Sequence, residues 1–381
     1  MRVALVAESF LPSVNGVTES LLRSIRHLTA RGHEAVVLAP TPTAEEHSLD
    51  DLSARAGAPV VWLPAVSLPG YRTFRLAPVG VARVRTLLRE LFPDVVHLAS
   101  PFLLGWDAVR AANELGLPTV AVYQTDVPRY AVHYGVGGLE PLLWRRVLDI
   151  HRRATVNLAP STSSIVQLHA RGVLNLRRWA RGVDAEQFCS ARRDPSFRSQ
   201  LSAGEKVIVG YAGRLAPEKQ LDDLSVLTDV TGVQLVLIGD GPTRGQLQRM
   251  LPGAVFLGWR HGIELARRVA SLDVMVHPGE RETFGQSVQE AMAAGVPVVA
   301  VAAGGILDLV TDGVTGYLYP IGALGRLRSS VIQLAGHPDR RAAMGAAARA
   351  AVRANSWADV GDQLITHYHD AINLSRAPLT V

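Results

Sequence analysis

Residues 207–219 read VIVGYAGRLAPEK, an apolar run typical of a buried strand and then a loop with a glycine, an arginine and a lysine. Similar apolar runs recur along the chain, with stretches of helical period between them. The predicted strands are residues 3–7, 35–39, 95–98, 119–123, 207–211, 234–238, 274–277 and 296–301. Apolar strands that alternate with helices are typical of parallel sheets covered on both faces. The sequence therefore predicts an α/β protein.

The series of strands begins again near residue 207, which predicts two sheets. A chain of 381 residues is also long enough for two to three domains. We expect a doubly wound N-terminal domain over residues 1–182 and a doubly wound C-terminal domain over residues 183–356. One more amphipathic helix is predicted over residues 357–373, and two positions stay open for it: on the second domain, or packed back on the first.

The composition excludes several classes of protein. With 48% hydrophobic and 19% charged residues, the chain is neither disordered nor fibrous. The single cysteine, Cys189, has no partner for an internal disulfide, and the first apolar run is too short for a signal peptide. Residues 291–310 resemble a membrane span, but glycines and a proline interrupt them. We therefore expect a cytoplasmic protein.

The positive charge is concentrated in the first half. Residues 1–184 hold 20 arginines against 15 acidic residues, whereas residues 185–381 hold 19 basic and 19 acidic residues. This excess predicts an anionic partner, either a phospholipid surface or nucleic acid. Arg83, Arg85 and Arg89 accompany apolar residues at helical spacing, a pattern that suits either membrane contact or a solvated helix face. Nucleic acid is disfavoured because the arginines have no interleaved aromatic residues.

Glycine and basic residues follow two predicted strands, where ligands bind in open α/β sheets. Gly16 opens the first helix, which suits either the approach of an anion to the helix amides or an ordinary capped turn. After Gly213, Arg214 and Lys219 are suited to hold a diphosphate, or else Arg214 pairs with Glu218 in a solvated loop.

The turn at residues 239–242 follows another strand but does not predict NAD. The glycine after Gly241 is Gly245, so the dinucleotide fingerprint G-x-G-x-x-G is not met. We interpret Gly241 as part of a tight turn between strand and helix, of a kind that can border a nucleotide.

Two carboxylates stand out in residues 277–291. Glu282 and Glu290 are separated by about 12 Å if the segment is helical, too far for the pair of a retaining glycosidase, which needs about 5 to 5.5 Å. They either accept hydrogen bonds from one long ligand or are surface charges. The histidines have no metal-ligand spacing and no Asp-x-Asp motif is present, so we expect no metal.

Together, the motifs GRLAPEK at 213–219, Glu282-x7-Glu290 and PSVNGV at 12–17 resemble those of the retaining glycosyltransferases of family 4. That family has the GT-B fold, two doubly wound Rossmann-like domains that face each other across a cleft. Four segments are most similar to actinobacterial GDP-mannose-dependent α-mannosyltransferases that act on glycolipids such as glucuronosyl diacylglycerol or phosphatidylinositol mannosides. They are residues 12–18, 94–101, 123–128 and 178–184.

The resemblance implies a role for each matching residue. Arg214 and Lys219 would bind the donor diphosphate and stabilise the leaving GDP, and Glu282 would accept from sugar hydroxyls. The other implied donor contacts are Gly16, Gly213, Gly241, Phe284, Gly285 and Glu290, the last of these with the ribose. The residues expected near the acceptor or the transferred sugar are His97, Gln124 and Asp126.

Gln124 departs from the pattern, because many relatives have a histidine there. Glutamine donates a hydrogen bond but does not titrate, so the expected mechanism has no histidine base. A phosphate oxygen of the leaving group takes the proton of the acceptor hydroxyl, and the anomeric configuration is retained.

The resemblance also implies the partners. We expect GDP-mannose as donor substrate, no cofactor, a glycolipid acceptor, an anionic membrane surface and no nucleic acid, with the enzyme peripheral at the inner face of the plasma membrane. A UDP-sugar-dependent enzyme of glucosyl or sulfoquinovosyl type, acting on diacylglycerol or a soluble acceptor, is the alternative. An epimerase or a phosphorylase with similar domains stays open as well.

Overall fold

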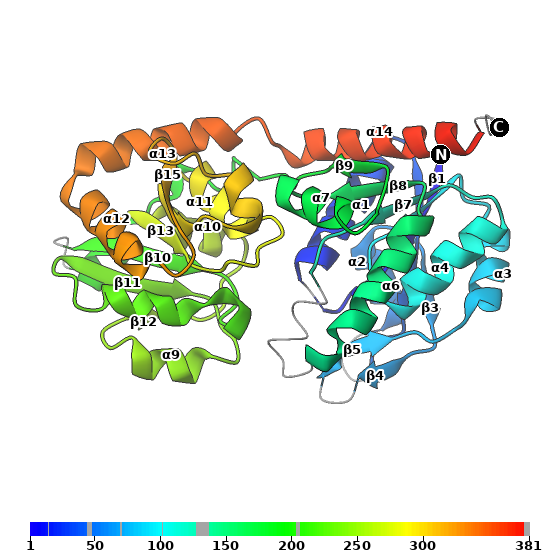
Figure 1. The fold of residues 1–381 in the computed structure, drawn as a ribbon, viewed down its shortest axis with the longest axis horizontal. Coiled ribbons are helices and arrows are strands. Elements are labelled where there is room, and N and C mark those ends of the chain that lie inside the picture. Colours follow the sequence, from blue (N-terminus) through cyan, green and yellow to red (C-terminus); the bar gives the residue numbers. More distant parts are fainter. Residues whose placement is uncertain are drawn as a thin grey trace. The chain divides into compact units, whose positions relative to one another are not determined.

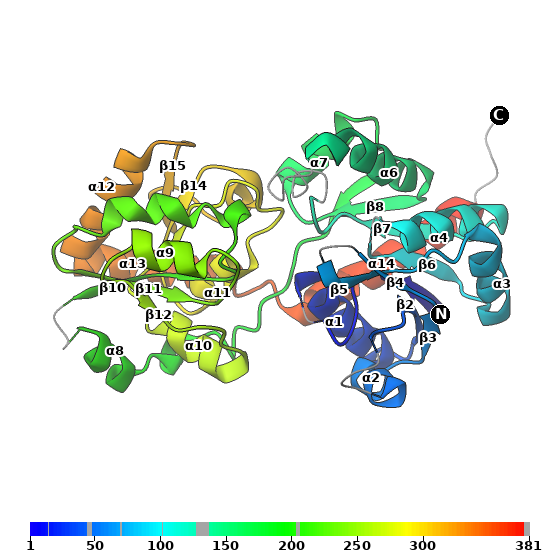
Figure 2. The same cartoon turned by 90° about the horizontal axis from the view of Figure 1, so that it is seen from below.

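The computed structural model describes residues 1–13, 15–43, 48–68, 71–100, 102–126, 137–202 and 206–376. The chain forms two compact units (Figures 1 and 2). Unit 1 contains residues 1–180 and the C-terminal helix from Ala358, and unit 2 contains residues 181–357.

Unit 1 is built on a seven-stranded parallel sheet with the strand order β3-β2-β1-β6-β7-β8-β9. The strands are β1 (Arg2–Val6), β2 (Glu34–Pro40), β3 (Val60–Leu63), β6 (Val95–Leu98), β7 (Thr119–Val122), β8 (Val156–Ala159) and β9 (Leu176–Arg178). A separate antiparallel hairpin contains β4 (Val66–Leu68) and β5 (Tyr71–Leu76). The helices are α1 (Gly16–Ala30), α2 (Leu49–Ala56), α3 (Val81–Leu91), α4 (Leu103–Glu114), α6 (Glu140–Arg153), α7 (Thr162–His169) and α14 (Trp357–Arg376).

Helices cover both faces of this sheet, which explains why its strands are apolar at successive positions. Val3 and Leu5 of β1 pack with α1, α2 and α14. Ala4 and Val6 face the other way and pack with α3 and α4. A strand buried on both faces has no solvent side for polar residues.

Helix α14 packs on unit 1 (Figure 1). Its Tyr368 is fully buried in the core. Trp179, at the end of the unit 1 sheet, donates from Nε1 to the Val360 carbonyl at 3.0 Å. His27 of α1 lies 2.8 Å from the carboxylate of Asp362. The last helix therefore completes the core of the first unit.

Unit 2 is built on a six-stranded parallel sheet with the order β12-β11-β10-β13-β14-β15. The strands are β10 (Val207–Ala212), β11 (Val233–Ile238), β12 (Val255–Phe256), β13 (Val274–His277), β14 (Val298–Val301) and β15 (Gly316–Tyr319). The α-helices are α8 (Pro195–Ser202), α9 (Arg244–Met250), α10 (Gly262–Ala270), α11 (Gln286–Ala293), α12 (Leu324–Gly336) and α13 (Pro338–Val352). Short 3-10 helices include η3 (Pro217–Lys219) and η5 (Gly304–Asp308).

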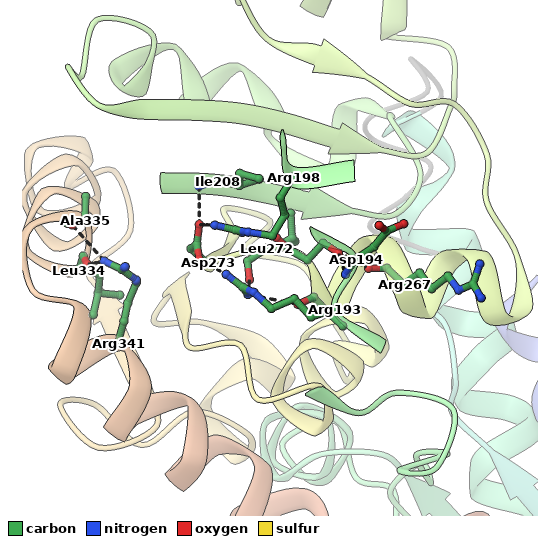
Figure 3. A network of polar contacts seen from close by, with 12 residues as sticks. Arg193, Asp194, Arg198, Ile208, Arg267, Leu272, Asp273, Leu334, Ala335 and Arg341 are labelled. Carbon is green, nitrogen blue, oxygen red and sulfur yellow. Dashed lines mark hydrogen bonds and ion pairs between the residues drawn. The ribbon is translucent and has the colours of Figure 1, made fainter. Parts of the chain in front are cut away.

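A buried carboxylate fixes the amino ends of β10 and β13 (Figure 3). Asp273, just before β13, accepts from the Ile208 backbone N–H of β10 at 2.8 Å. Arg193 and Arg198 pair with the same carboxylate at 2.5 and 3.0 Å. Burial raises the pKa of Asp273, but the backbone hydrogen bond and the two arginines outweigh it and lower the pKa. The segment before α8 is thus tied to the base of the sheet.

Each sheet has a point at which the connections leave in opposite directions. β1 lies between β2 and β6, and β10 lies between β11 and β13. In doubly wound sheets, ligands bind beyond the carboxyl ends of the strands at this point. The structure confirms the predicted α/β class with two Rossmann-like sheets, and it identifies the loops after β1, β6, β10 and β13 as the places to search for a site.

Candidate functional site

The loops after β10 and β13 meet at an ion pair in unit 2. The ammonium of Lys219 pairs with the carboxylate of Glu282, and the two side chains are only 17% and 14% exposed. Burial by itself raises the pKa of Glu282, but the charge of Lys219 and the nearby His277 ring outweigh it and hold that pKa well below its usual range. Glu282 is therefore ionised at neutral pH and can accept hydrogen bonds but not donate a proton.

His277 contacts the Glu282 side of this ion pair. It ends β13, is buried, and places Nε2 at 3.3 Å from the Glu282 carboxylate. Its ring stacks on Tyr211 of β10, with ring centroids 6.0 Å apart. The Tyr211 hydroxyl in turn donates to the Arg214 carbonyl at 3.1 Å. A continuous set of contacts therefore joins the backbone of Arg214 to the carboxylate of Glu282.

Two further contacts hold the Glu282 loop. The Gly305 N–H of η5 donates to the Glu282 carbonyl at 2.8 Å, and a Cβ on Gly304 would lie 2.3 Å from the same oxygen. Gln220 and Glu280 exchange hydrogen bonds, from the Gln220 amide to the Glu280 carboxylate at 3.0 Å and from the Glu280 N–H to Gln220 Oε1 at 2.8 Å. The loops that carry Lys219 and Glu282 are thus joined to each other and to η5.

Glu290, on α11, lines a pocket of about 80 Å³ at the ends of β10 and β11. Gln286 donates to the Glu290 carboxylate at 3.3 Å. The other lining residues are Ala212, Gly213, Ile238, Gly239, Trp259, Arg260, Leu265 and Ser287. A Cβ on Gly239 would lie 1.9 Å from the Gly213 carbonyl, so glycine is needed where the two loops cross. The pocket is thus lined by apolar residues and glycines together with Glu290 and Arg260.

The remaining predicted donor residues of unit 2 lie on the same set of loops. The Arg214 guanidinium is 46% exposed, and its Nη1 lies 4.0 Å from the buried Glu218 carboxylate. A Cβ on Gly241 would lie 2.2 Å from the Leu215 carbonyl, so this turn packs directly on the Arg214 loop. Gly285, at φ 100°, begins α11, and the Phe284 side chain before it is buried.

The predicted residues of unit 1 have different surroundings. Gly16 begins α1, where the Asn15 side chain caps the helix by accepting from the N–H groups of the next turn. Gln124 follows β7 and is partly exposed, and Asp126 is buried and accepts from Gln167 at 3.1 Å. Of the segments quoted above, Val14, Pro101, Val127 and Pro128 lie outside the described residues.

His97, expected near the acceptor or the transferred sugar, is buried within unit 1. Its side chain is buried under α14, where Nδ1 lies 2.8 Å from the Tyr368 hydroxyl. Burial lowers the pKa of His97 to about 3, so the imidazole is neutral. His97 thus joins β6 to the last helix, and its place near the acceptor stays a prediction.

The basic helix α3 was expected to form either a membrane contact or a solvated helix face. Its apolar residues Val84, Leu87 and Leu88 are buried in the core of unit 1, so they are not available to a lipid. Arg85 pairs with Glu114 of α4 at 2.5 Å, while Arg83 and Arg89 are exposed. The apolar side of α3 packs in the core with α4, so the exposed side of the helix is its charged side.

The described residues contain neither a candidate metal cluster nor a helix suited to cross a membrane. Within residues 1–13, 15–43, 48–68, 71–100, 102–126, 137–202 and 206–376, no cluster of three or more His, Cys, Asp or Glu side chains is placed to hold a metal ion. In the same ranges no helix combines the length and the apolar character that a membrane crossing needs.

Comparison with known proteins identifies the family. The model of Glycosyltransferase Family 4 matches residues 14–187, and that of the glycosyl transferases group 1 matches residues 192–351. A GDP-mannose-dependent alpha-mannosyltransferase of Mycobacterium tuberculosis is 47% identical over 97% of this chain and 96% of its own. The chain belongs to glycosyltransferase family 4. A family 4 enzyme of the same name from Corynebacterium glutamicum is 42% identical over 100% of this chain and 92% of its own.

Solved structures show the fold of this family 4 enzyme. Anabaena HepE in complex with UDP superimposes with a TM-score of 0.78 at 21% identity, and the match covers 97% of this chain and 100% of that one. These comparisons confirm the predicted GT-B fold, the family and the enzyme class.

Sequence reasoning missed His277, Gln220 and Gly304 as parts of the site. The available signal was that each stands beside a motif or at the end of a strand.

Proposed function

We propose that this family 4 enzyme transfers mannose from GDP-mannose to a hydroxyl of a membrane glycolipid, with retention of configuration and without a metal ion. The observation that carries the proposal is the Lys219–Glu282 pair on the loops beside a pocket that contains Glu290. The donor assignment is supported by the relatives that share 42% and 47% of its sequence along nearly the whole chain.

Unit 2 binds the donor in this proposal. Glu290 accepts hydrogen bonds from the ribose hydroxyls at the wall of the pocket. Arg214 and Lys219 bind the diphosphate, and the exposed guanidinium of Arg214 suits a bidentate contact with phosphate oxygens. Glu282 accepts hydrogen bonds from hydroxyls of the mannose, a task that suits a carboxylate whose pKa is held low.

The chemical step needs charge stabilisation more than a separate base. As the bond from mannose to GDP breaks, negative charge develops on the leaving phosphate, and the fixed cations of Arg214 and Lys219 stabilise it. A leaving phosphate oxygen takes the proton of the acceptor hydroxyl on the face from which GDP departs, so the new bond has the configuration of the old one. Gln124 contributes hydrogen bonding alone, since an amide does not accept this proton.

Unit 1 binds the acceptor and the membrane in this proposal. The arginine excess of residues 1–184 favours an anionic lipid surface. Because the apolar side of α3 is buried, Arg83 and Arg89 act through charge and not through insertion. The enzyme is then a peripheral protein at the inner face of the plasma membrane.

The test is a transfer assay in the presence of EDTA. Purified protein is mixed with GDP-mannose or UDP-glucose and vesicles that contain glucuronosyl diacylglycerol, and NMR determines the anomeric configuration of the product. We expect an α-mannoside from GDP-mannose, loss of transfer in Arg214→Ala, and wild-type rates in the control Arg267→Ala, whose side chain is exposed on α10. A product from UDP-glucose alone would overturn the donor, and a β-mannoside would overturn retention.

A further inference from the structure

Two residues that line the unit 2 pocket, Trp259 and Arg260, have no role in the proposed function. They stand in the turn between β12 and α10. Neither residue belongs to a motif of the family resemblance. Both residues nevertheless line the same pocket as Glu290, whose carboxylate we assign to the ribose.

The structure holds the Arg260 guanidinium at this place from two sides. Its Nη1 donates to the Trp259 carbonyl at 2.8 Å, and its Nε lies 3.3 Å from the carboxylate of Glu264, one turn along α10. The side chain is 35% exposed, so it is neither buried in the unit nor extended into solvent. An arginine held in this way presents a planar set of donors to a ligand in the pocket.

Trp259 offers a flat surface beside that guanidinium. Its ring is parallel to the His261 ring within 15°, with centroids 6.2 Å apart, and the residue is 51% exposed. A large aromatic residue half exposed at the edge of a pocket is a surface on which a planar base can stack.

We propose that Arg260 donates to the O6 and N7 atoms of the donor's guanine and thereby selects a guanine over a uracil nucleotide, while Trp259 supplies a stacking surface for the base. The inference rests on the proposed function, because the base is bonded to the ribose that Glu290 holds. O6 and N7 are adjacent acceptors on one edge of guanine, and they match the two-pronged donor of arginine. On the corresponding edge, uracil offers the acceptor O4 with only the C5–H beside it.

The two residues therefore have separable effects. Loss of Arg260 removes contacts that guanine alone makes, so it lowers the affinity for GDP and leaves that for UDP nearly unchanged. Loss of Trp259 removes stacking, which every base provides, so it lowers both affinities by similar factors.

Calorimetric titration of the full chain with GDP, UDP and 7-deaza-GDP tests this assignment. A bidentate arginine contact corresponds to about a 10- to 100-fold change in affinity for GDP on Arg260→Ala. UDP binding should change by less than about threefold, within the additivity error of independent sites. Arg267→Ala, which removes an equal charge from the exposed side of α10, should bind every nucleotide as the wild type does.

7-Deaza-GDP and Arg260→Ala together form a thermodynamic cycle, which distinguishes a direct contact with N7 from a general distortion of the pocket. 7-Deaza-GDP lacks the N7 acceptor, so it should bind the wild type more weakly than GDP, and the two should bind Arg260→Ala equally. In Arg260→Lys the charge stays but the fork is lost, so the preference for GDP over UDP should fall between those of the wild type and the alanine variant. Thermal unfolding of each variant verifies that the fold is intact.

Three results would overturn the inference. Equal losses for GDP and UDP in Arg260→Ala would show a general charge effect, and unchanged GDP binding would show that Arg260 does not touch the base. In both cases the proposed function would still be supported if wild-type protein binds GDP and Glu290→Ala does not. A wild-type protein that binds no guanine nucleotide would overturn the proposed function together with the inference.

Discussion

Lys219 and Glu282 lie 63 residues apart in the sequence and form a largely buried ion pair at the carboxyl ends of two neighbouring strands. A buried charge that loses its partner is strongly destabilising, so each residue of this pair stabilises the other by neutralising its charge. In the proposed function, Lys219 gains a second anionic partner when a diphosphate binds, and we expect the Glu282 oxygens to turn to the sugar.

Glu282→Gln should separate sugar recognition from nucleotide binding. The amide keeps the shape but loses the charge that accepts sugar hydroxyls and holds Lys219. We expect kcat/KM for GDP-mannose to fall by about 100-fold or more, since a charged hydrogen-bond partner is lost at the reacting sugar, whereas the affinity for GDP changes by only a few-fold. Steady-state kinetics and calorimetry measure the two quantities. Glu186→Gln, an exposed carboxylate of the same unit, serves as control, and equal losses of both quantities would contradict the assigned role.

Glu8 should make the stability of unit 1 depend on pH. It is buried after β1 and accepts from the Leu104 N–H at 3.0 Å, and burial raises its pKa to about 8 from an unfolded value near 4.5. Between these values the folded chain keeps a proton that the unfolded chain releases, so the free energy of unfolding falls as the pH rises.

Glu8→Gln removes this titration and keeps the hydrogen-bond acceptor. The unfolding free energy of the variant, relative to the wild type, should therefore rise by roughly 1 kcal/mol for each pH unit between about 5 and 8. Urea unfolding at several pH values measures the difference, with the exposed Glu34→Gln as control. A difference between Glu8→Gln and wild type that does not vary with pH would show that Glu8 does not hold a proton in the folded chain.

The sequence predicted the parts of the site that lie in continuous segments. The loop 213–219 and the pair Glu282 and Glu290 could be predicted because glycines and charged residues directly follow an apolar run typical of a strand. The surroundings of His97 could not be predicted in this way, because its place at a strand end resembles that of a ligand-binding residue. Its hydroxyl partner Tyr368 lies 271 residues away, and no local pattern shows that a later helix will cover it.

Charge reversal at Arg83 and Arg89 should weaken binding to anionic membranes. Each arginine near such a surface contributes about 1 kcal/mol, so Arg83→Glu with Arg89→Glu should lower partitioning onto phosphatidylglycerol vesicles by at least about tenfold. Binding should also fall as salt is added. Vesicle sedimentation measures this, and Arg267→Glu with Arg326→Glu is a control of equal charge at exposed positions of unit 2. Equal losses in both double variants would indicate a net-charge effect without a specific surface.

Gly304 should be required for the position of Glu282 and not merely for its own turn. Both Gly304, at φ 59°, and Gly313, at φ 74°, have a backbone conformation that alanine adopts at a cost of about 1 kcal/mol. The added Cβ differs in its surroundings, because at Gly304 it would lie 2.3 Å from the Glu282 carbonyl and at Gly313 it meets nothing within 4 Å.

The two alanine variants therefore share the conformational cost, and their difference isolates the contact. Gly304→Ala forces the Glu282 backbone away from η5 and should lower kcat/KM by about 100-fold, the order expected for a misplacement of about 1 Å. Gly313→Ala should lose a similar part of the backbone stability and keep its activity. Urea unfolding and steady-state kinetics on both variants measure this. Full activity in Gly304→Ala would show that the Glu282 loop tolerates the shift, which would remove η5 from the machinery of the site.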